Sequence, residues 1–307
     1  MTKKEYMGFS ERMMNIYSGI LFNNQVFDDG DCSEIIYDFD CPEFVVLKEK
    51  YKLEEIAGKG SDFRRAKRLL HYLAPRLCHS SWYDNHVPCN ALDLLEYSFE
   101  DPENGINCLN KAKILEECCL AVGIYGRRIR IMPYSPYDFD NHVVTEIYDR
   151  ETGKWIMLDP TTDGYFVDVN GLPLSILEIR DKFARAEFVT FVRSTGSLKD
   201  LNKLKEKYVD RNSYICKNLF YFYVDKASTF GDKGEFLAFV PKGYSVKEKQ
   251  IANVEYRIKN LPEDLKELIP NLKVRLEELK NSEEEKRTDI ESMRKAPMGI
   301  KKQESQK

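Results

Sequence analysis

The sequence predicts an α+β protein, because helical patterns come first along the chain and strand patterns follow. Between residues 61 and 122 apolar residues recur at helical spacing, whereas the following segments are short apolar runs bounded by turn residues. This order differs from the strand–helix alternation of a doubly wound parallel sheet. We therefore expect a helix packed on an antiparallel sheet.

The chain of 307 residues is long enough for about two domains, or for one large domain with additions. We expect an N-terminal accessory region over residues 1–58, a catalytic core over 59–195 and a C-terminal β extension over 196–262. Residues 263–307 are expected to form a charged helical or disordered tail, because large apolar residues become scarce from residue 282 onward.

The composition excludes several classes of protein. With 47 Lys+Arg against 51 Asp+Glu, the net charge of −4 predicts no general attraction to nucleic acid or to acidic membranes. The sequence has no run of 18 apolar residues, so we expect no transmembrane helix. We also expect no secretory signal, because no apolar run follows the basic residues near the start of the sequence. The eight cysteines are widely spread and include an adjacent pair, so we expect free thiols and a cytoplasmic protein.

Three helices are expected before the first long strand. In the first, apolar residues at helical spacing follow Ser61 as far as Leu77, and Pro75 interrupts them. The second begins after Asn90, a good N-cap residue. In the third, one apolar face starts at Cys108 and ends before Gly123, which places Cys108 in the first turn of a helix.

The strand patterns begin with residues 128–132, 142–148 and 154–159, and the last two are joined by a turn over 149–153. Four further strands are expected, at residues 165–169, 186–192, 219–224 and 235–240. In the N-terminal region we expect a short helix around Met13 and Tyr17 and an apolar stretch over residues 44–47.

Cys108, His142 and Asp159 are the residue types that thiol catalysis requires, and they lie at a helix start, a strand start and a strand end. A thiol becomes a good nucleophile when a helix N-terminus and an imidazolium favour its thiolate form. Neighbouring antiparallel strands can place a histidine and a carboxylate on one face, so that Asp159 orients His142. Whether they share a face depends on the strand register.

In this context the sequence resembles the transglutaminase-like proteins of the papain-like cysteine hydrolase superfamily. Residues 105–112 (GINCLNKA) and 121–128 (AVGIYGRR) resemble that family's active-site helix and the strand after it. Residues 141–147 (NHVVTEI) and 154–161 (KWIMLDPT) resemble its His and Asp strands. The resemblance covers about residues 62–177. At residues 78–85 and 169–175 the sequence is similar to the bacterial stand-alone members of the family.

This resemblance implies a papain-like core in which Cys108, His142 and Asp159 form a catalytic triad. The implied reaction is acyl transfer or hydrolysis at an amide or peptide bond of a peptide or protein substrate, through a thioester on Cys108. It needs no metal or organic cofactor. In such enzymes the oxyanion is held by the backbone N–H of the cysteine and by a side-chain donor from the upstream segment, for which Trp82 is our candidate.

Each of these residues also has a simpler explanation. Cys108 alone could be a small buried residue, His142 a core histidine, Asp159 a turn residue before Pro160, and Trp82 part of the core or of a pocket wall. The whole domain could be a catalytically idle papain-like module that binds a peptide or a partner protein. An amidase like the peptide N-glycanases is a third reading, weakened by the absence of C-x-x-C pairs upstream.

Two other groups of residues could carry a function. Cys78, His79, His86 and Cys89 have the ligand chemistry of a zinc site, but their spacing does not match known zinc motifs, and we expect no metal. The basic residues of segments 111–113 and 127–130 are most simply solvated, although an arginine beside the cleft could bind a substrate carboxylate.

Overall fold

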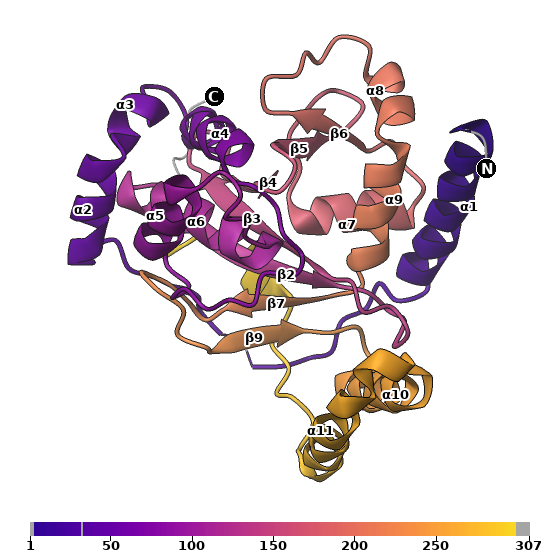
Figure 1. Ribbon diagram of the computed structural model, residues 1–307. Helices are drawn as coiled ribbons and strands as arrows, with labels where there is room; N and C mark the ends of the chain where they lie inside the picture. The colour runs from indigo at the N-terminus through magenta and orange to yellow at the C-terminus, as the bar shows by residue number, and fades with distance from the viewer. Residues whose placement is uncertain (1–2, 32, 299–307) are drawn as a thin grey trace.

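The computed structural model describes residues 3–31 and 33–298 and has a mixed α+β architecture (Figure 1). A seven-stranded antiparallel sheet runs through the middle, in the order β6-β5-β4-β3-β2-β7-β9. Its strands are β2 (Gly126–Met132), β3 (His142–Asp149), β4 (Lys154–Asp159), β5 (Gly164–Val167), β6 (Thr190–Arg193), β7 (Tyr221–Asp225) and β9 (Phe236–Phe239). The short strands β1 (Ile36–Tyr37) and β8 (Ala227–Ser228) form a separate parallel pair.

Helices cover both faces of this sheet (Figure 1). The first half of the chain contributes α1 (Lys3–Phe22), α2 (Pro42–Lys50), α3 (Leu53–Ala57), α4 (Asp62–Leu73), the 3₁₀ turn η1 (Ala74–Arg76), α5 (Ala91–Glu100) and α6 (Cys108–Ala121). The second half contributes α7 (Ile176–Ala184), α8 (Leu201–Lys207), α9 (Val209–Asn218), α10 (Val246–Asn260), the 3₁₀ turn η2 (Glu263–Leu268), α11 (Ile269–Asn281) and α12 (Glu291–Arg294).

Two apolar clusters lie on opposite faces of the sheet, because successive residues of a strand point to opposite sides. Ile147 of β3 belongs to the cluster formed with α4, α5 and α6, whereas Val144 of the same strand belongs to the cluster formed with α7 and α9. Every residue of β3 is buried. Such double coverage buries the polar residues of β3 as well, among them Thr145 and Glu146.

The α+β class, the antiparallel sheet and the three helices before it confirm the predictions from the sequence. Ser61 and Asn90 cap α4 and α5 through their side chains, as expected, and Gly123 follows α6 with a positive φ of 74°. The seven expected strands all form, with ends shifted by a few residues.

The expected boundary at residue 195 does not separate two structural units. Strand β7 pairs with β2, and β9 pairs with β7, so residues 221–239 extend the central sheet itself. The segment 196–262 is also not mainly β, because it contains α8, α9 and α10. Pairing between strands distant in sequence cannot be recognised from local patterns, and this caused the misplaced boundary.

The N-terminal region contains more helix than expected. Helix α1 has 20 residues and packs against α7 and α9. The apolar stretch over 44–47 lies within α2, where Phe44 and Leu47 are buried while Val45 and Val46 are exposed. No helix in the described part of the chain has the length and apolar character needed to cross a membrane.

The segment after α11 was expected to be frayed or disordered, but as far as residue 298 it packs on the protein. Met293 is buried in the cluster that includes α7 and α9. Its carbonyl accepts a hydrogen bond of 2.7 Å from Arg127, and Trp155 Nε1 donates to the Lys295 carbonyl at 2.9 Å. Few apolar side chains suffice to anchor this segment because backbone groups make many of its contacts.

Candidate active site

Helix α6 presents Cys108 at its N-terminus. The side chain of Asn107 caps the helix by accepting a hydrogen bond of 3.3 Å from the backbone N–H of Asn110, and Cys108 is the first helical residue. Residues 110–121 are all buried, so the helix is held on every side. Backbone N–H groups of a first helical turn have no partner within the helix. The sulfur of Cys108 therefore lies at a rigid, electropositive position.

His142 and Asp159 lie on the same face of the sheet. The β3–β4 register pairs Thr145 with Leu158, and its continuation by one residue places Asp159 across from Val144. Val144 and His142 are two residues apart on β3, so their side chains point to the same side. The distance from His142 Nε2 to Asp159 Oδ2 is 3.1 Å, and the two side chains are 3% and 0% exposed.

Hydrogen bonding and charge around His142 favour its protonated form. Burial alone lowers the pKa of His142, but the carboxylate of Asp159 and hydrogen bonds with Asp159 and Cys108 raise it to about 9. Cys108 lines the same cleft as the imidazole that Asp159 bonds. The structure brings together the three residues that the sequence analysis selected.

Three residues besides His142 also hold the carboxylate of Asp159. Arg211 Nη2 lies 2.5 Å from Asp159 Oδ2, the Thr162 hydroxyl donates to the same oxygen at 2.9 Å, and the backbone N–H of Thr161 donates to Oδ1 at 2.9 Å. Burial would raise the pKa of Asp159, but Arg211 and then His142 hold it well below its usual range. The carboxylate stays ionised and fixed in orientation.

Helix α9 supplies two residues of the site that the sequence analysis missed. Arg211 and Tyr214 are three residues apart and share one face of the helix. The Tyr214 ring meets the His142 ring edge-on at a centroid distance of 5.5 Å, and its hydroxyl donates to Asp140 at 3.3 Å. The sequence contained one signal for a helix here, the helical spacing of Val209, Cys216 and neighbouring apolar residues. Tyrosines and β-branched residues, which are typical of strands, obscured this signal.

Cys108 and His142 open into a cleft of about 550 Å³. Its wall combines the start of α6, the adjoining parts of β2 and β3, the loop before β3 and helix α9. Lining side chains include His79, Ser81, Arg130, Phe139, Tyr214 and Tyr223. A cleft of this size lies within the range of small-molecule and cofactor sites.

The structure does not bring Trp82 to the cleft. Its side chain is 94% exposed and is absent from the cleft wall, so the indole is not placed to act as an oxyanion donor. The neighbouring His79 and Ser81 line the cleft instead, and His79 Nε2 lies 3.1 Å from Ser81 Oγ. Exposure of one residue in an irregular segment was not predictable from its sequence pattern.

A close approach of two segments holds His79 and Ser81 near Cys108. The backbone N–H of Ser80 donates to the Ile106 carbonyl at 3.1 Å. Gly105 permits this contact, because a Cβ at this position would lie 2.9 Å from the Ser80 Cβ. Any larger residue at 105 would push the two segments apart and change the cleft.

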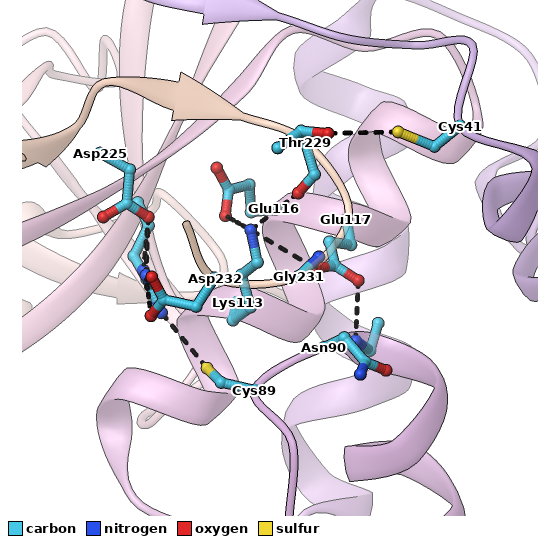
Figure 2. A network of polar contacts seen from close by, with 12 residues as sticks. Cys41, Cys89, Asn90, Lys113, Glu116, Glu117, Asp225, Thr229, Gly231 and Asp232 are labelled. Carbon is cyan, nitrogen blue, oxygen red and sulfur yellow. Dashed lines mark hydrogen bonds and ion pairs between the residues drawn. The ribbon is translucent and has the colours of Figure 1, made fainter. Parts of the chain in front are cut away.

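Buried ion pairs anchor the middle of α6 (Figure 2). Lys113 Nζ lies 3.0 Å from Glu116 and 3.4 Å from Glu117. Glu117 also accepts backbone hydrogen bonds from Ala91 at 2.7 Å and Gly231 at 2.8 Å. Burial raises the pKa of Glu117 to about 7, although Lys113 opposes this shift. The network ties α6 to the start of α5 and to the loop after β8.

Arg128 forms the second part of this network. It contacts Asp225 at 2.7 Å and Asp232 at 2.8 Å, and it donates to Cys89 Sγ at 3.4 Å. Figure 2 labels these three partners. The basic residues expected to be solvated are therefore mostly buried, namely Lys111, Lys113, Arg127 and Arg128. Their burial is tolerated because carboxylates or backbone carbonyls on segments remote in sequence neutralise or bond them.

No group of three or more His, Cys, Asp or Glu side chains within residues 3–31 and 33–298 is arranged to hold a metal. Cys89, one of the residues considered for zinc, is instead bonded by Arg128.

Comparison of the chain with protein-family models, with curated proteins and with solved structures found no match.

Proposed function

We propose that this protein is a cysteine-dependent enzyme that transfers or hydrolyses the acyl group of an amide or peptide bond through a thioester on Cys108. The observation that carries the proposal is that Cys108 and His142 line one cleft and that His142 is hydrogen-bonded to the buried Asp159. The order of these three residues along the chain, and the helix and strands that carry them, agree with the resemblance to transglutaminase-like proteins. In that family a papain-like core carries the same three residue types. Peptides and proteins are the proposed substrates.

The reaction would begin with attack of the Cys108 thiolate on the carbonyl carbon. A C–S bond forms, the carbonyl oxygen becomes an oxyanion, and the C–N bond breaks as protonated His142 gives its proton to the leaving amine. Water or a second amine then attacks the thioester. Neutral His142 takes the proton of the attacking group, the C–S bond breaks, and the Cys108 thiolate returns. Water gives hydrolysis, and an amine gives transamidation.

Hydrogen-bond donors from two segments near Cys108 support our proposal that the oxyanion is stabilised. The backbone N–H of Cys108 belongs to the first turn of α6 and has no helical partner. His79 and Ser81 line the same cleft and carry side chains that can donate hydrogen bonds. We propose one of these, in place of Trp82, as the second donor.

The residues around Asp159 support a fixed catalytic geometry. Arg211 and Thr162 restrain its carboxylate, which in turn restrains the His142 ring.

The described cysteines are free thiols, which supports the cytoplasmic, reducing environment expected from the sequence.

The proposal is tested by acylation with p-nitrophenyl acetate, an activated ester that needs no knowledge of the natural substrate. We expect a burst of p-nitrophenolate and an acetyl group on Cys108 in the intact mass, followed by release to water or to an added primary amine. His142→Ala should lower the acylation rate by about 10²- to 10⁴-fold. Cys78→Ser, which removes an exposed thiol outside the cleft wall, is the matched control.

Loss of the burst in Cys108→Ser but not in Cys78→Ser would support the proposal. Acetylation spread evenly over the cysteines, or an unchanged burst in His142→Ala, would contradict it. In that case the idle binding module would become the better account of the fold. The relative rates of release to water and to amine would distinguish a hydrolase from an acyltransferase.

A further inference from the structure

Arg130 differs from the other charged side chains of the cleft. Asp159 compensates both His142 and Arg211. Asp140 lies 3.6 Å from Lys217 and accepts a hydrogen bond from Tyr214. Within residues 3–31 and 33–298, the Arg130 side chain forms no hydrogen bond or ion pair, and its Nε is buried without a partner.

The nearest carboxylates are already engaged. Asp225 and Asp232 act on Arg130 electrostatically, but both form their close contacts with Arg128, at 2.7 and 2.8 Å. Burial, followed by the charge of Arg128, lowers the pKa of Arg130. Because a guanidinium keeps its proton even so, Arg130 remains a cation with little local compensation.

The position of Arg130 is fixed by its surroundings. Its guanidinium carbon lies 3.9 Å from the centre of the Phe236 ring, which restrains the plane of the group. On the strand, Arg130 pairs directly with Val143, the residue after His142. Its Cα is therefore one strand spacing, about 5 Å, from the segment that carries the catalytic imidazole.

We propose that Arg130 binds a carboxylate of the acyl-donor peptide and so selects acidic peptides as substrates of this cleft. This inference rests on the proposed function for its identification of the ligand as a peptide. A planar guanidinium with several N–H donors matches the two oxygens of a carboxylate, and the aromatic ring beneath it reduces the freedom lost on binding. The carboxylate belongs either to an Asp or Glu side chain or to the peptide's C-terminus.

The test is direct binding of fluorescein-labelled pentapeptides to the Cys108→Ala protein, measured by fluorescence anisotropy. Matched peptides carry Glu or Gln at each position in turn, and each is made with a free or an amidated C-terminus. We expect at least one carboxylate-bearing peptide to bind about tenfold or more tightly than its neutral match, as for a hydrogen bond to a charged group. The arm that shows the preference identifies the source of the carboxylate.

Arg130→Gln should abolish that preference, and Arg130→Lys should retain part of it. Arg193→Gln, at an exposed position of β6 outside the cleft wall, should leave it unchanged. Equal binding of acidic and neutral peptides, or no binding by any acidic peptide, would overturn the inference. If Arg130→Gln fails to fold, Arg130→Lys decides the assignment: a reduced preference supports the inference, and an unchanged preference overturns it.

Because this binding assay uses a protein without the Cys108 thiol, its outcome does not depend on catalysis. A failed acetylation burst with a clear acidic preference would contradict the proposed enzyme while supporting Arg130 as a carboxylate-binding residue. A normal burst with no acidic preference would support the proposed enzyme and contradict the role of Arg130 as a carboxylate-binding residue.

Discussion

Arg211 on α9 contacts Asp159 at the end of β4, with 2.5 Å between Nη2 and Oδ2. This ion pair joins a helix from late in the chain to the hairpin that carries His142. Asp159 therefore lies between two cations, one of which lines the same cleft as Cys108. The arrangement makes Arg211 a positioning residue whose charge also affects the imidazole.

Replacing Arg211 by Gln should raise the pKa of His142. The positive charge of Arg211 lowers that pKa, and Asp159 would stay ionised through Thr161 and Thr162. We expect an upward shift on the order of half a unit, measured by NMR titration of the His142 ring protons. Arg211→Lys should restore most of the original value. An unchanged pKa in Arg211→Gln would show that Arg211 has only a structural role.

Protonated His142 should stabilise the folded protein over a defined range of pH. Its pKa is raised from 6.5 to about 9 on folding, so the stabilisation is fully present below about 6.5 and is lost as the pH rises through about 9. The difference in unfolding free energy between wild type and His142→Gln should therefore shrink across this interval, as measured by urea unfolding. A difference that grows with pH would contradict the direction of the shift.

Ala112→Leu should destabilise the protein and impair acylation. Ala112 is fully buried in α6, and its carbonyl accepts a hydrogen bond of 2.9 Å from Thr145 on β3. A larger side chain should force α6 away from the sheet at a cost of about 1–3 kcal/mol. Ala252→Leu, at a half-buried position of α10, is the control. Equal thermal stability of the two variants would show that the contact of α6 with the sheet tolerates extra volume.

Met293→Ala should destabilise the protein by about 2–5 kcal/mol, because the Met293 side chain is 1% exposed and packs in a core cluster. Met298→Ala, at a side chain that is 70% exposed, should have almost no effect. The measurement is the midpoint of chemical unfolding for both variants. Equal midpoints would show that the packing of Met293 adds no stability, as for the disordered tail expected from the sequence.

The sequence predicted those parts of the site that depend on local patterns. The helix start at Cys108, the strand start at His142 and the strand end at Asp159 each follow from residue spacing and capping. The shared face of His142 and Asp159 needed the strand register. Arg211 could not be predicted, because its contact with Asp159 spans 52 residues and depends on how α9 packs on the sheet.

The errors in the basic segments have a similar origin. Lys113 and Arg128 look like surface residues in the sequence, and only the folded chain brings Glu117 and Asp225 to them. Trp82 was misjudged for the opposite reason, since large apolar residues are usually buried but this one lies in an exposed irregular segment.

The most direct test of the central claim is the rate at which iodoacetamide alkylates Cys108 as a function of pH. Mass spectrometry can locate the label and compare Cys108 with the other seven cysteines, in wild type and in His142→Ala. We predict fast labelling near about pH 6 that collapses in the variant, because an imidazolium and a helix N-terminus favour the thiolate. Slow labelling that rises only above about pH 8.5 and is unaffected by loss of His142 would contradict the account.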